Sequence, residues 1–233
     1  KKLRDNVLKN EEYIYEALYK DFGKSSFETY TSELGIFLEE INYHIKNLKK
    51  WSKPLKVATP FAFFPAKSYI YPEPYGVVLI ISPWNYPFLL LMNPLVGAIS
   101  SGNCAILKPA DYSKNTSIII KKIINDSFSP EYISIFTGGR DVNKELLKEK
   151  YDYIFFTGSP SLAKEIMAEA SKNLTPLTLE LGGKSPCIID ENTDIKTTAL
   201  RSVWGKFFNC GQTCVAPDYF FVNKNIKNEF IEL

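Results

Sequence analysis

Apolar residues recur at helical spacing through the first 52 residues of the chain. They form two groups: Leu3, Val7, Ile14 and Leu18, and then Leu34, Phe37, Leu38, Ile41, Ile45 and Leu48. Because residues three and four positions apart share one side of a helix, this pattern predicts amphipathic helices. The stretch Asp21–Lys24 interrupts the pattern, and the second helix is expected to end at Trp51–Pro54.

Residues 54–75 differ in composition and are rich in proline and aromatic side chains. The prolines are Pro54, Pro60, Pro65, Pro72 and Pro74. Since proline lacks an amide hydrogen and interrupts regular structure, the segment is expected to be an irregular crossing, with one short strand near Tyr69.

From Gly76 onward, short apolar runs alternate with longer amphipathic stretches. Strands are expected at 76–82, 104–107, 132–136, 153–156, 178–181, 187–190 and 219–222, and helices at 88–101, 113–127, 141–150, 160–173 and 194–208. This alternation predicts an α/β fold, a Rossmann-like doubly wound parallel sheet with helices on both faces.

Composition narrows the classes of function. The chain has 233 residues, of which 45% are hydrophobic and 23% charged, and 28 basic against 26 acidic residues give a net charge of +2. This near-balance predicts no nucleic-acid partner. No run reaches the roughly 18 apolar residues of a membrane span, and no signal sequence is recognisable, so a cytoplasmic location is expected.

The two ends of the sequence both lie within helical patterns. There is no initiator Met, position 1 already falls within a helical pattern, and Asn223–Leu233 is helical without a cap. We therefore expect the chain to be a piece of a longer protein.

Four motifs follow expected strands. They are Ser82–Pro87, Lys108–Asp111, Phe156–Ser159 and Leu179–Pro186, the last followed about 30 residues later by Phe208–Pro217. In doubly wound sheets, ligands bind beyond the carboxyl ends of the strands, so these motifs are expected to share one site.

Each motif alone also has a purely structural explanation. Asn85 could satisfy a turn, and Lys108 before a proline could be a surface lysine. Gly158–Ser159 is common helix-capping chemistry, and Glu180 could belong to a structural ion pair. A loop cysteine such as Cys214 is more often an ordinary thiol than a nucleophile.

In this order, the motifs resemble the aldehyde dehydrogenase superfamily. The sequences of Leu179–Pro186 and of Gly211–Tyr219 resemble those of its class 3 branch. The similarity extends to Glu73–Val77 and Trp204–Phe207. The resemblance implies N-terminal helices and a dinucleotide-binding domain over residues 1–180, and the beginning of a second α/β catalytic domain over 181–233.

The resemblance also implies catalytic roles that chemistry supports. Cys214 matches the nucleophilic cysteine, whose thiolate would form a thiohemiacetal with the aldehyde. Asn85 matches the amide that stabilises the oxyanion together with the Cys214 N–H, and one such donor typically contributes about 3–4 kcal/mol. Glu180 matches the general base that activates water to hydrolyse the thioester.

For the cofactor, NAD or NADP, the resemblance assigns five further residues. Lys108 and Asp111 match residues that serve the adenosine ribose, although the family often has a glutamate where this chain has Asp111. Gly158–Ser159 matches the turn that brings the pyrophosphate to a helix N-terminus, and Trp84 matches a wall of the cleft. The family usually has a glycine where this chain has Ala163, which is small enough to keep the close packing.

The remaining cysteines and the single histidine receive structural interpretations. Cys210 and Cys214 have C-x-x-x-C spacing without a second pair, so no metal site is expected. Cys104 and Cys187 lie in apolar strands and are expected to be core thiols. His44 lies on an N-terminal helix, and nothing in the sequence places it near Cys214.

The leading hypothesis is thus an NAD(P)-dependent oxidation of medium or long aliphatic or aromatic aldehydes to carboxylic acids, by an enzyme of which this chain is an incomplete part. The longer parent is expected to be a homodimer. A non-catalytic fragment or pseudoenzyme is the alternative, and a thiol redox or metal protein is a third. We expect residues 176–233 to expose apolar faces and the isolated chain to self-associate.

Overall fold

The computed structural model describes residues 1–233, and its first 51 residues form a layer of helices. The elements are α1 (Lys2–Lys9), α2 (Glu11–Phe22), α3 (Ser26–Thr29), the π-helical turn η1 (Tyr30–Leu34) and α4 (Gly35–Trp51). Gly23 ends α2 with φ 67°, a left-handed conformation that glycine adopts without steric cost. The two helical segments and the break at Asp21–Lys24 are therefore confirmed.

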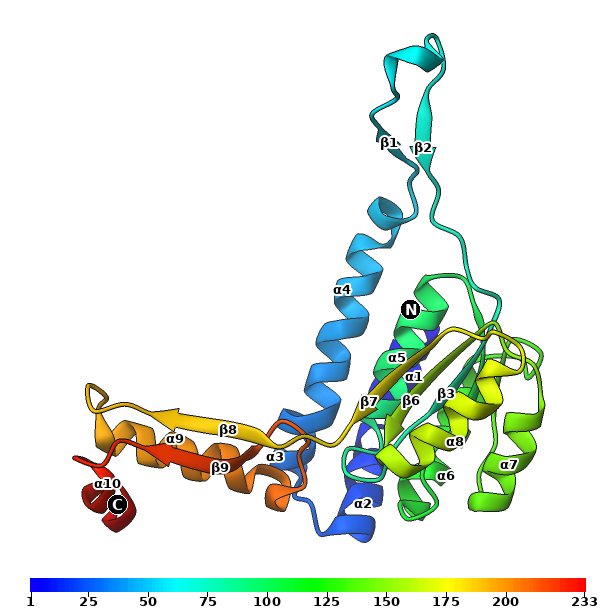
Figure 1. Ribbon diagram of the computed structural model, residues 1–233. Helices are drawn as coiled ribbons and strands as arrows, with labels where there is room; N and C mark the ends of the chain where they lie inside the picture. The colour runs from blue at the N-terminus through cyan, green and yellow to red at the C-terminus, as the bar shows by residue number, and fades with distance from the viewer.

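Residues 54–75 form a projecting hairpin: most of the segment is irregular as expected, but it contains two short paired strands instead of one. Strand β1 (Leu55–Val57) pairs antiparallel with β2 (Ser68–Ile70), and the 3-10 turn η2 (Phe61–Phe63) lies between them. Figure 1 shows the hairpin extending away from the rest of the chain, in cyan. The strand near Tyr69 is present, but its partner was not recognised from the sequence.

A five-stranded parallel sheet occupies the centre of the chain and confirms the predicted α/β fold. Its strands are β3 (Val77–Ile81), β4 (Cys104–Lys108), β5 (Ile133–Ile135), β6 (Tyr153–Gly158) and β7 (Leu177–Leu181), in the order β5-β4-β3-β6-β7. The chain winds outward from β3 in one direction and then returns to the other side with β6. The carboxyl ends of β3 and β6 thus flank the topological switch point, where ligands bind in such sheets.

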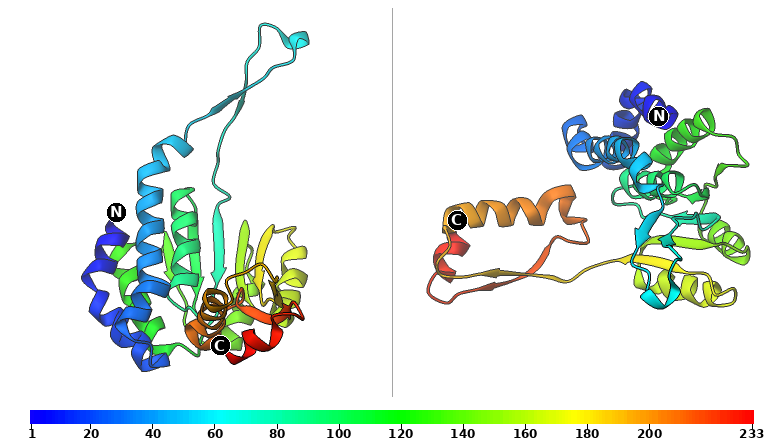
Figure 2. Two further views of the ribbon diagram at one scale, coloured as in Figure 1. Left: turned by 90° about the vertical axis from the view of Figure 1, so that its left-hand side faces the viewer. Right: turned by 90° about the horizontal axis from the view of Figure 1, so that it is seen from above.

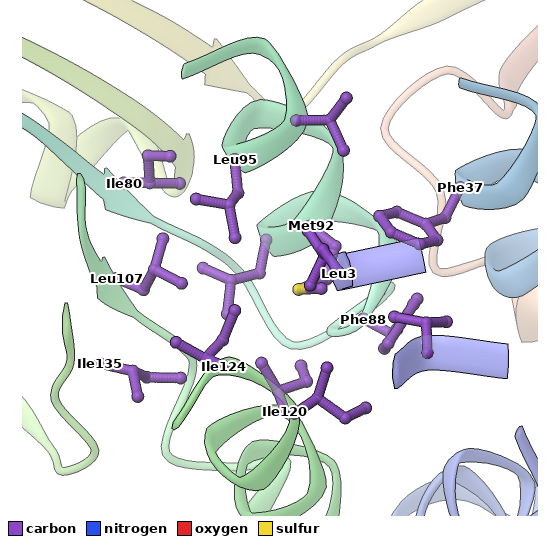
Figure 3. Close-up of a cluster of buried hydrophobic side chains, with 14 of the residues drawn as sticks. Leu3, Phe37, Ile80, Phe88, Met92, Leu95, Leu107, Ile120, Ile124 and Ile135 are labelled. Atoms are coloured by element: carbon purple, nitrogen blue, oxygen red, sulfur yellow. The ribbon is translucent and has the colours of Figure 1, made fainter. Parts of the chain in front are cut away.

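Helices cover both faces of this sheet (Figure 1). They are α5 (Leu89–Ser100), α6 (Lys114–Ser127), α7 (Arg140–Lys148) and α8 (Pro160–Ser171). Alternate residues of β3 point to opposite faces, so Val78 and Ile80 join one buried cluster while Leu79 and Ile81 join another. The first and larger cluster also takes in side chains of the N-terminal helices, as Figure 3 shows for Leu3 and Phe37.

Residues 182–233 form a small separate β-α-β unit, the C-terminal unit. Strands β8 (Ser185–Ile189) and β9 (Pro217–Val222) pair in parallel, joined by α9 (Ile195–Phe207) and the turn η3 (Phe208–Gly211), and α10 (Lys227–Glu232) follows. Figures 1 and 2 show this unit, in orange and red, extending away from the five-stranded sheet. No helix in the structure combines the length and the apolar character needed to span a bilayer.

Candidate active site

A cavity of about 540 Å³ lies at the carboxyl ends of the central strands. Its lining includes all eight residues that the sequence singled out: Trp84, Asn85, Lys108, Asp111, Gly158, Ser159, Glu180 and Cys214. These residues span 130 positions of sequence and come from four strand ends and the C-terminal unit. The structure thus brings the sequence-predicted residues together around one space.

The loop between β3 and α5 meets the loop that precedes Cys214. The Asn85 side-chain amide donates to the Gln212 carbonyl at 2.8 Å, and the Asn209 amide donates to the Asn85 carbonyl at 2.8 Å. The Tyr86 hydroxyl and the Thr213 Oγ1 lie 2.5 Å apart. These three hydrogen bonds link residues 182–233 to the preceding chain, and all three involve Asn85 or Tyr86.

The side chain of Asn85 is consequently oriented by the segment Asn209–Cys214, the cysteine loop. Only one of its two amide hydrogens is used by the Gln212 carbonyl, so the other is free for a ligand. Its neighbour Tyr86 is buried, and this burial raises the pKa of the Tyr86 hydroxyl, which stays a neutral partner of Thr213.

Cys214 carries an exposed thiol at the edge of the cavity. The backbone leading to it is unusual, because Asn209 and Cys210 have φ of 54° and 56° in η3. Gly183 passes so close to Cys214 that a Cβ at this position would lie 2.4 Å from the Cys214 carbonyl oxygen. A glycine is therefore required at 183 for the cysteine loop to lie where it does.

Glu180 lies in β7, paired in register with Thr157 of β6. The side chain is exposed at the cavity and takes part in none of the ion pairs of the structure. The structural ion pair considered as an alternative for this residue is thus absent. An unpaired carboxylate at the cavity is free to bind water or a polar ligand.

Lys108 and Asp111 follow β4. The Lys108 side chain is only 3% exposed, and its ammonium donates to the Pro109 carbonyl at 2.9 Å, which leaves two further donors without a protein partner. Burial lowers the pKa of the Lys108 ammonium, and the nearby Asp111 carboxylate acts in the opposite direction. Asp111 itself is exposed, with Oδ2 3.2 Å from the place of a Cβ on Gly139.

The N-terminus of α8 faces the same cavity. Ser159 caps this helix, accepting from the Leu162 N–H, and Pro160 occupies its first turn. A Cβ at Gly158 would lie 2.5 Å from the Phe156 ring, so the glycine keeps the turn narrow. Ala163 is 2% exposed and packs in the second buried cluster, so alanine fits where the family usually has glycine.

Several residues in or beside the cavity were not singled out from the sequence: Gln212 and Thr213 line it, whereas Tyr86 and Asn209 contact its loops without being part of the lining. Tyr86, Asn209, Gln212 and Thr213 belong to motifs that were quoted, but their mutual contacts join segments more than 120 positions apart. Ser82 also lines the cavity, and its buried hydroxyl has no hydrogen-bond partner. No local signal distinguishes such a serine from one that merely ends a strand.

The other cysteines and His44 lie outside any such arrangement. Cys104 and Cys187 are only half-buried, so the expectation that they are core thiols was too strong. His44 contacts Ser100 and Glu40 and is not part of the cavity lining. No group of three or more His, Cys, Asp or Glu side chains is placed to hold a metal ion.

Comparison with known proteins gives consistent matches. The model of the "Aldehyde dehydrogenase family" matches residues 1–233. The chain is 48% identical over 231 residues to 4,4'-diaponeurosporen-aldehyde dehydrogenase of Staphylococcus aureus, covering 99% of this chain and 50% of that protein. It is 46% identical over 233 residues to aldehyde dehydrogenase family 3 comG of Dictyostelium discoideum, again covering 50% of the relative.

Solved structures agree. The substrate-bound state of the Staphylococcus aureus AldH superposes with a TM-score of 0.97 at 48% identity, covering 99% of this chain and 50% of that one. A structure of lactaldehyde dehydrogenase gives a TM-score of 0.90 at 26% identity, covering 99% and 48%. The chain thus spans about half the length of the curated relatives and of the structures that it matches.

Proposed function

This chain belongs to the aldehyde dehydrogenase family, with relatives in its class 3 branch, and from that premise we propose that it supplies the cofactor site and the nucleophile for oxidising aldehydes to carboxylic acids with NAD or NADP. The observation that carries the proposal is the single cavity that brings Cys214, Asn85 and Glu180 together with Lys108 and the N-terminus of α8.

Cys214 is the proposed nucleophile. Its thiolate adds to the carbonyl carbon of the aldehyde, and the carbonyl oxygen becomes the alkoxide of a thiohemiacetal. The free amide hydrogen of Asn85 and the backbone N–H of Cys214 stabilise this negative oxygen. Because Asn85 is already held by the Gln212 carbonyl, the donor is oriented before the reaction begins.

Other residues of the cavity lining suit a dinucleotide cofactor. When bound, the nicotinamide would supply the oxidation by taking up a hydride from the substrate carbon. The two spare donors of the Lys108 ammonium suit ribose hydroxyls, with Asp111 as the acceptor beside it. The N–H groups at the start of α8 other than that of Leu162, beside Gly158 and Ser159, suit a pyrophosphate, and Trp84 forms a wall of the cavity.

Glu180 is the proposed general base. Loss of hydride leaves an acyl group on the Cys214 sulfur, and the exposed Glu180 carboxylate takes a proton from a water molecule that attacks this thioester. The carbon–sulfur bond then breaks, the carboxylic acid leaves, and the thiolate is regenerated. No metal is needed for any step.

The proposed substrates are medium or long aliphatic or aromatic aldehydes. This rests on similarity to class 3 relatives, one of which is named for an apolar aldehyde, 4,4'-diaponeurosporen-aldehyde. We also propose the division into residues 1–180, which bind the cofactor, and residues 181–233, which begin a catalytic domain. A homodimeric parent and a cytoplasmic location remain predictions from the sequence.

The test is steady-state kinetics of the full-length enzyme, meaning a polypeptide of the relatives' whole length that carries these 233 residues. Aldehyde-dependent formation of NADH or NADPH is expected with a panel of aldehydes and both cofactors, and Cys214→Ala is expected to abolish it. No reaction with any aldehyde would refute the proposal and favour the alternative of a pseudoenzyme. The 233-residue chain alone is expected to show little or no turnover.

A further inference from the structure

A buried ion pair lies in the N-terminal helical layer, outside the proposed catalytic residues. Lys24 and Glu33 are 4% and 0% exposed, and Lys24 Nζ lies 2.7 Å from Glu33 Oε1. Removing two charges from water is costly, so a buried pair is a weak source of stability compared with apolar side chains. Its contacts point instead to a role at the neighbouring loop.

The second oxygen of Glu33 binds the start of helix α5. Oε2 accepts the N–H groups of Phe88 at 2.9 Å and of Leu89 at 3.1 Å. The first amides of a helix have no partner within it and favour an anion, so this carboxylate caps α5 from a distant part of the sequence. Burial raises the pKa of Glu33, while the Lys24 ammonium and the two amides counteract it, and three donors around two oxygens are the surroundings of a carboxylate.

The capped segment is the one that carries Asn85. It runs from the end of β3 to the start of α5, and Tyr86 lies within it. Lys24 Nζ lies 4.9 Å from the centre of the Tyr86 ring, and the Tyr86 hydroxyl contacts Thr213, the residue before Cys214. Contacts therefore run without a break from the ion pair to the cysteine loop.

The local backbone at Glu33 is also specialised. Glu33 lies in η1, a single π-helical turn between α3 and α4. Such turns insert one residue into a helix and are rare, and they occur frequently at functional sites.

We propose that Glu33, with its charge balanced by Lys24, is a positioning residue that fixes Asn85 in relation to Cys214. This inference rests on the proposed function, because Asn85 needs a fixed position only if it stabilises the oxyanion formed at Cys214. The competing explanation is that the pair only stabilises the fold. The two differ in whether the chemical step changes in molecules that remain folded.

Two double variants of the full-length enzyme separate these explanations. Lys24→Met with Glu33→Leu removes both charges and the acceptor for the α5 amides, whereas Lys24→Met with Glu33→Gln keeps a side-chain carbonyl as acceptor. The pre-steady-state rate of NADH formation, expressed per titrated Cys214 thiol, is expected to fall about 10- to 100-fold in the Leu variant, since small misplacements at a reacting centre have effects of this size. The Gln variant is expected to recover most of the rate.

A double-mutant cycle with Asn85→Ala tests whether Glu33 acts through Asn85. In the Asn85→Ala background, replacing the ion pair is expected to slow the reaction little further, because the group that it positions is gone. Asp21 supplies a matched control, since its carboxylate accepts the N–H groups of Asn115 and Thr116 at the start of α6. The effects of Asp21→Leu and Asn85→Ala are expected to multiply.

Each result decides the matter. A full rate per thiol in the Leu variant, with only a lower melting temperature, would overturn the positioning role while leaving the proposed function intact. The positioning role would also be overturned if the rate reductions caused by replacing the ion pair and by Asn85→Ala multiplied in the combined variant. If the unmodified enzyme forms no NADH, the proposed function fails and this inference fails with it. If the Leu variant does not fold, Lys24→Met alone decides: a full rate per thiol contradicts the positioning role, and a lower rate that falls no further in the Asn85→Ala background supports it.

Discussion

The five-stranded sheet and the C-terminal unit are both built from parallel strands joined by helices, yet they differ in what covers them. Residues 1–181 contain two buried clusters of 24 and 9 side chains, with helices on both faces of the sheet. In residues 182–233 the buried residues are only Ile189, Ala199, Asn209, Ala216 and Ile226. The same supersecondary unit therefore has a two-sided core in one region and almost no core in the other.

The exposed apolar side chains of the C-terminal unit make the contrast sharper. On α9 they are Leu200, Val203, Trp204 and Phe207, and on the two strands Ile188, Tyr219 and Phe221. Contiguous apolar surface of this kind marks a place where another protein surface packs. A β-α-β pattern in sequence thus specifies local structure, while burial depends on the layers available to cover it.

The largest expected effect is on stability, from a matched pair of leucines. Leu95 of α5 is fully buried and Leu200 of α9 is 73% exposed. Leu95→Ala is expected to lower the free energy of unfolding by about 2–5 kcal/mol, because it leaves a cavity. Leu200→Ala is expected to change it by less than about 0.5 kcal/mol. Denaturant unfolding measures both, and equal losses would show that the α9 face is buried in solution.

Next in size is the effect of Gly183→Ala on activity, because the cysteine loop passes against this glycine. The new Cβ would lie 2.4 Å from the Cys214 carbonyl oxygen, so the loop must shift. A shift of about 1 Å is expected to slow oxidation by about 100-fold. Turnover of the full-length enzyme tests this, with Gly182→Ala as the control, since a Cβ at Gly182 meets no atom within 4 Å. Equal losses in both variants would contradict the role of the close approach.

A smaller effect is expected on the association of the 233-residue chain. The apolar face of α9 should cause self-association at micromolar concentration, and Leu200→Lys with Trp204→Lys should shift the chain toward monomer, since a charge cannot be buried in such a contact without cost. Light scattering reports the mass. If the unmodified 233-residue chain is monodisperse and monomeric, the α9 face does not act as an exposed apolar contact surface.

The smallest effect concerns acid and the start of α9. Asp194 caps this helix, accepting from the Thr197 N–H, and this hydrogen bond lowers the pKa of the Asp194 carboxyl. A carboxyl whose pKa is lower in the folded state contributes stability above its unfolded pKa of about 3.9 and loses it as the pH falls through the folded value. The difference in melting temperature between the unmodified chain and Asp194→Asn should therefore shrink as the pH falls from about 5 to about 3. An unchanged difference would exclude the ionised cap.

Much of the fold could be predicted because the relevant signals are local. The alternation of apolar runs and amphipathic stretches located all seven expected strands from Gly76 onward, and each is present within about three residues at either end. Seven of the eight candidate residues were singled out at or just after the ends of expected strands, and Cys214 through a motif that resembles the family. The parallel topology brings the seven to one cavity, and the hydrogen bonds of Asn85 and Tyr86 bring the loop of Cys214 to it.

What the sequence did not reveal depends on contacts between distant segments. Strand β1 has only three residues and is defined by pairing with β2. The role of Glu33 at α5 joins positions 55 apart, and that of Tyr86 at Thr213 joins positions 127 apart. A buried glutamate within an amphipathic helical pattern carries no sign of which helix it caps. Such partners are determined by tertiary packing, which composition and periodicity do not encode.

The sparse connection between the two regions has a consequence for engineering chimaeras. Because three hydrogen bonds at Asn85 and Tyr86 join residues 182–233 to the preceding chain, the C-terminal unit has few sequence requirements on its partner. We expect residues from 182 onward to be exchangeable as one block among relatives that keep Asn85, Tyr86 and Gly183. The loop that carries Cys214 would then come from one relative, while the cofactor site, Asn85 and Glu180 would come from the other.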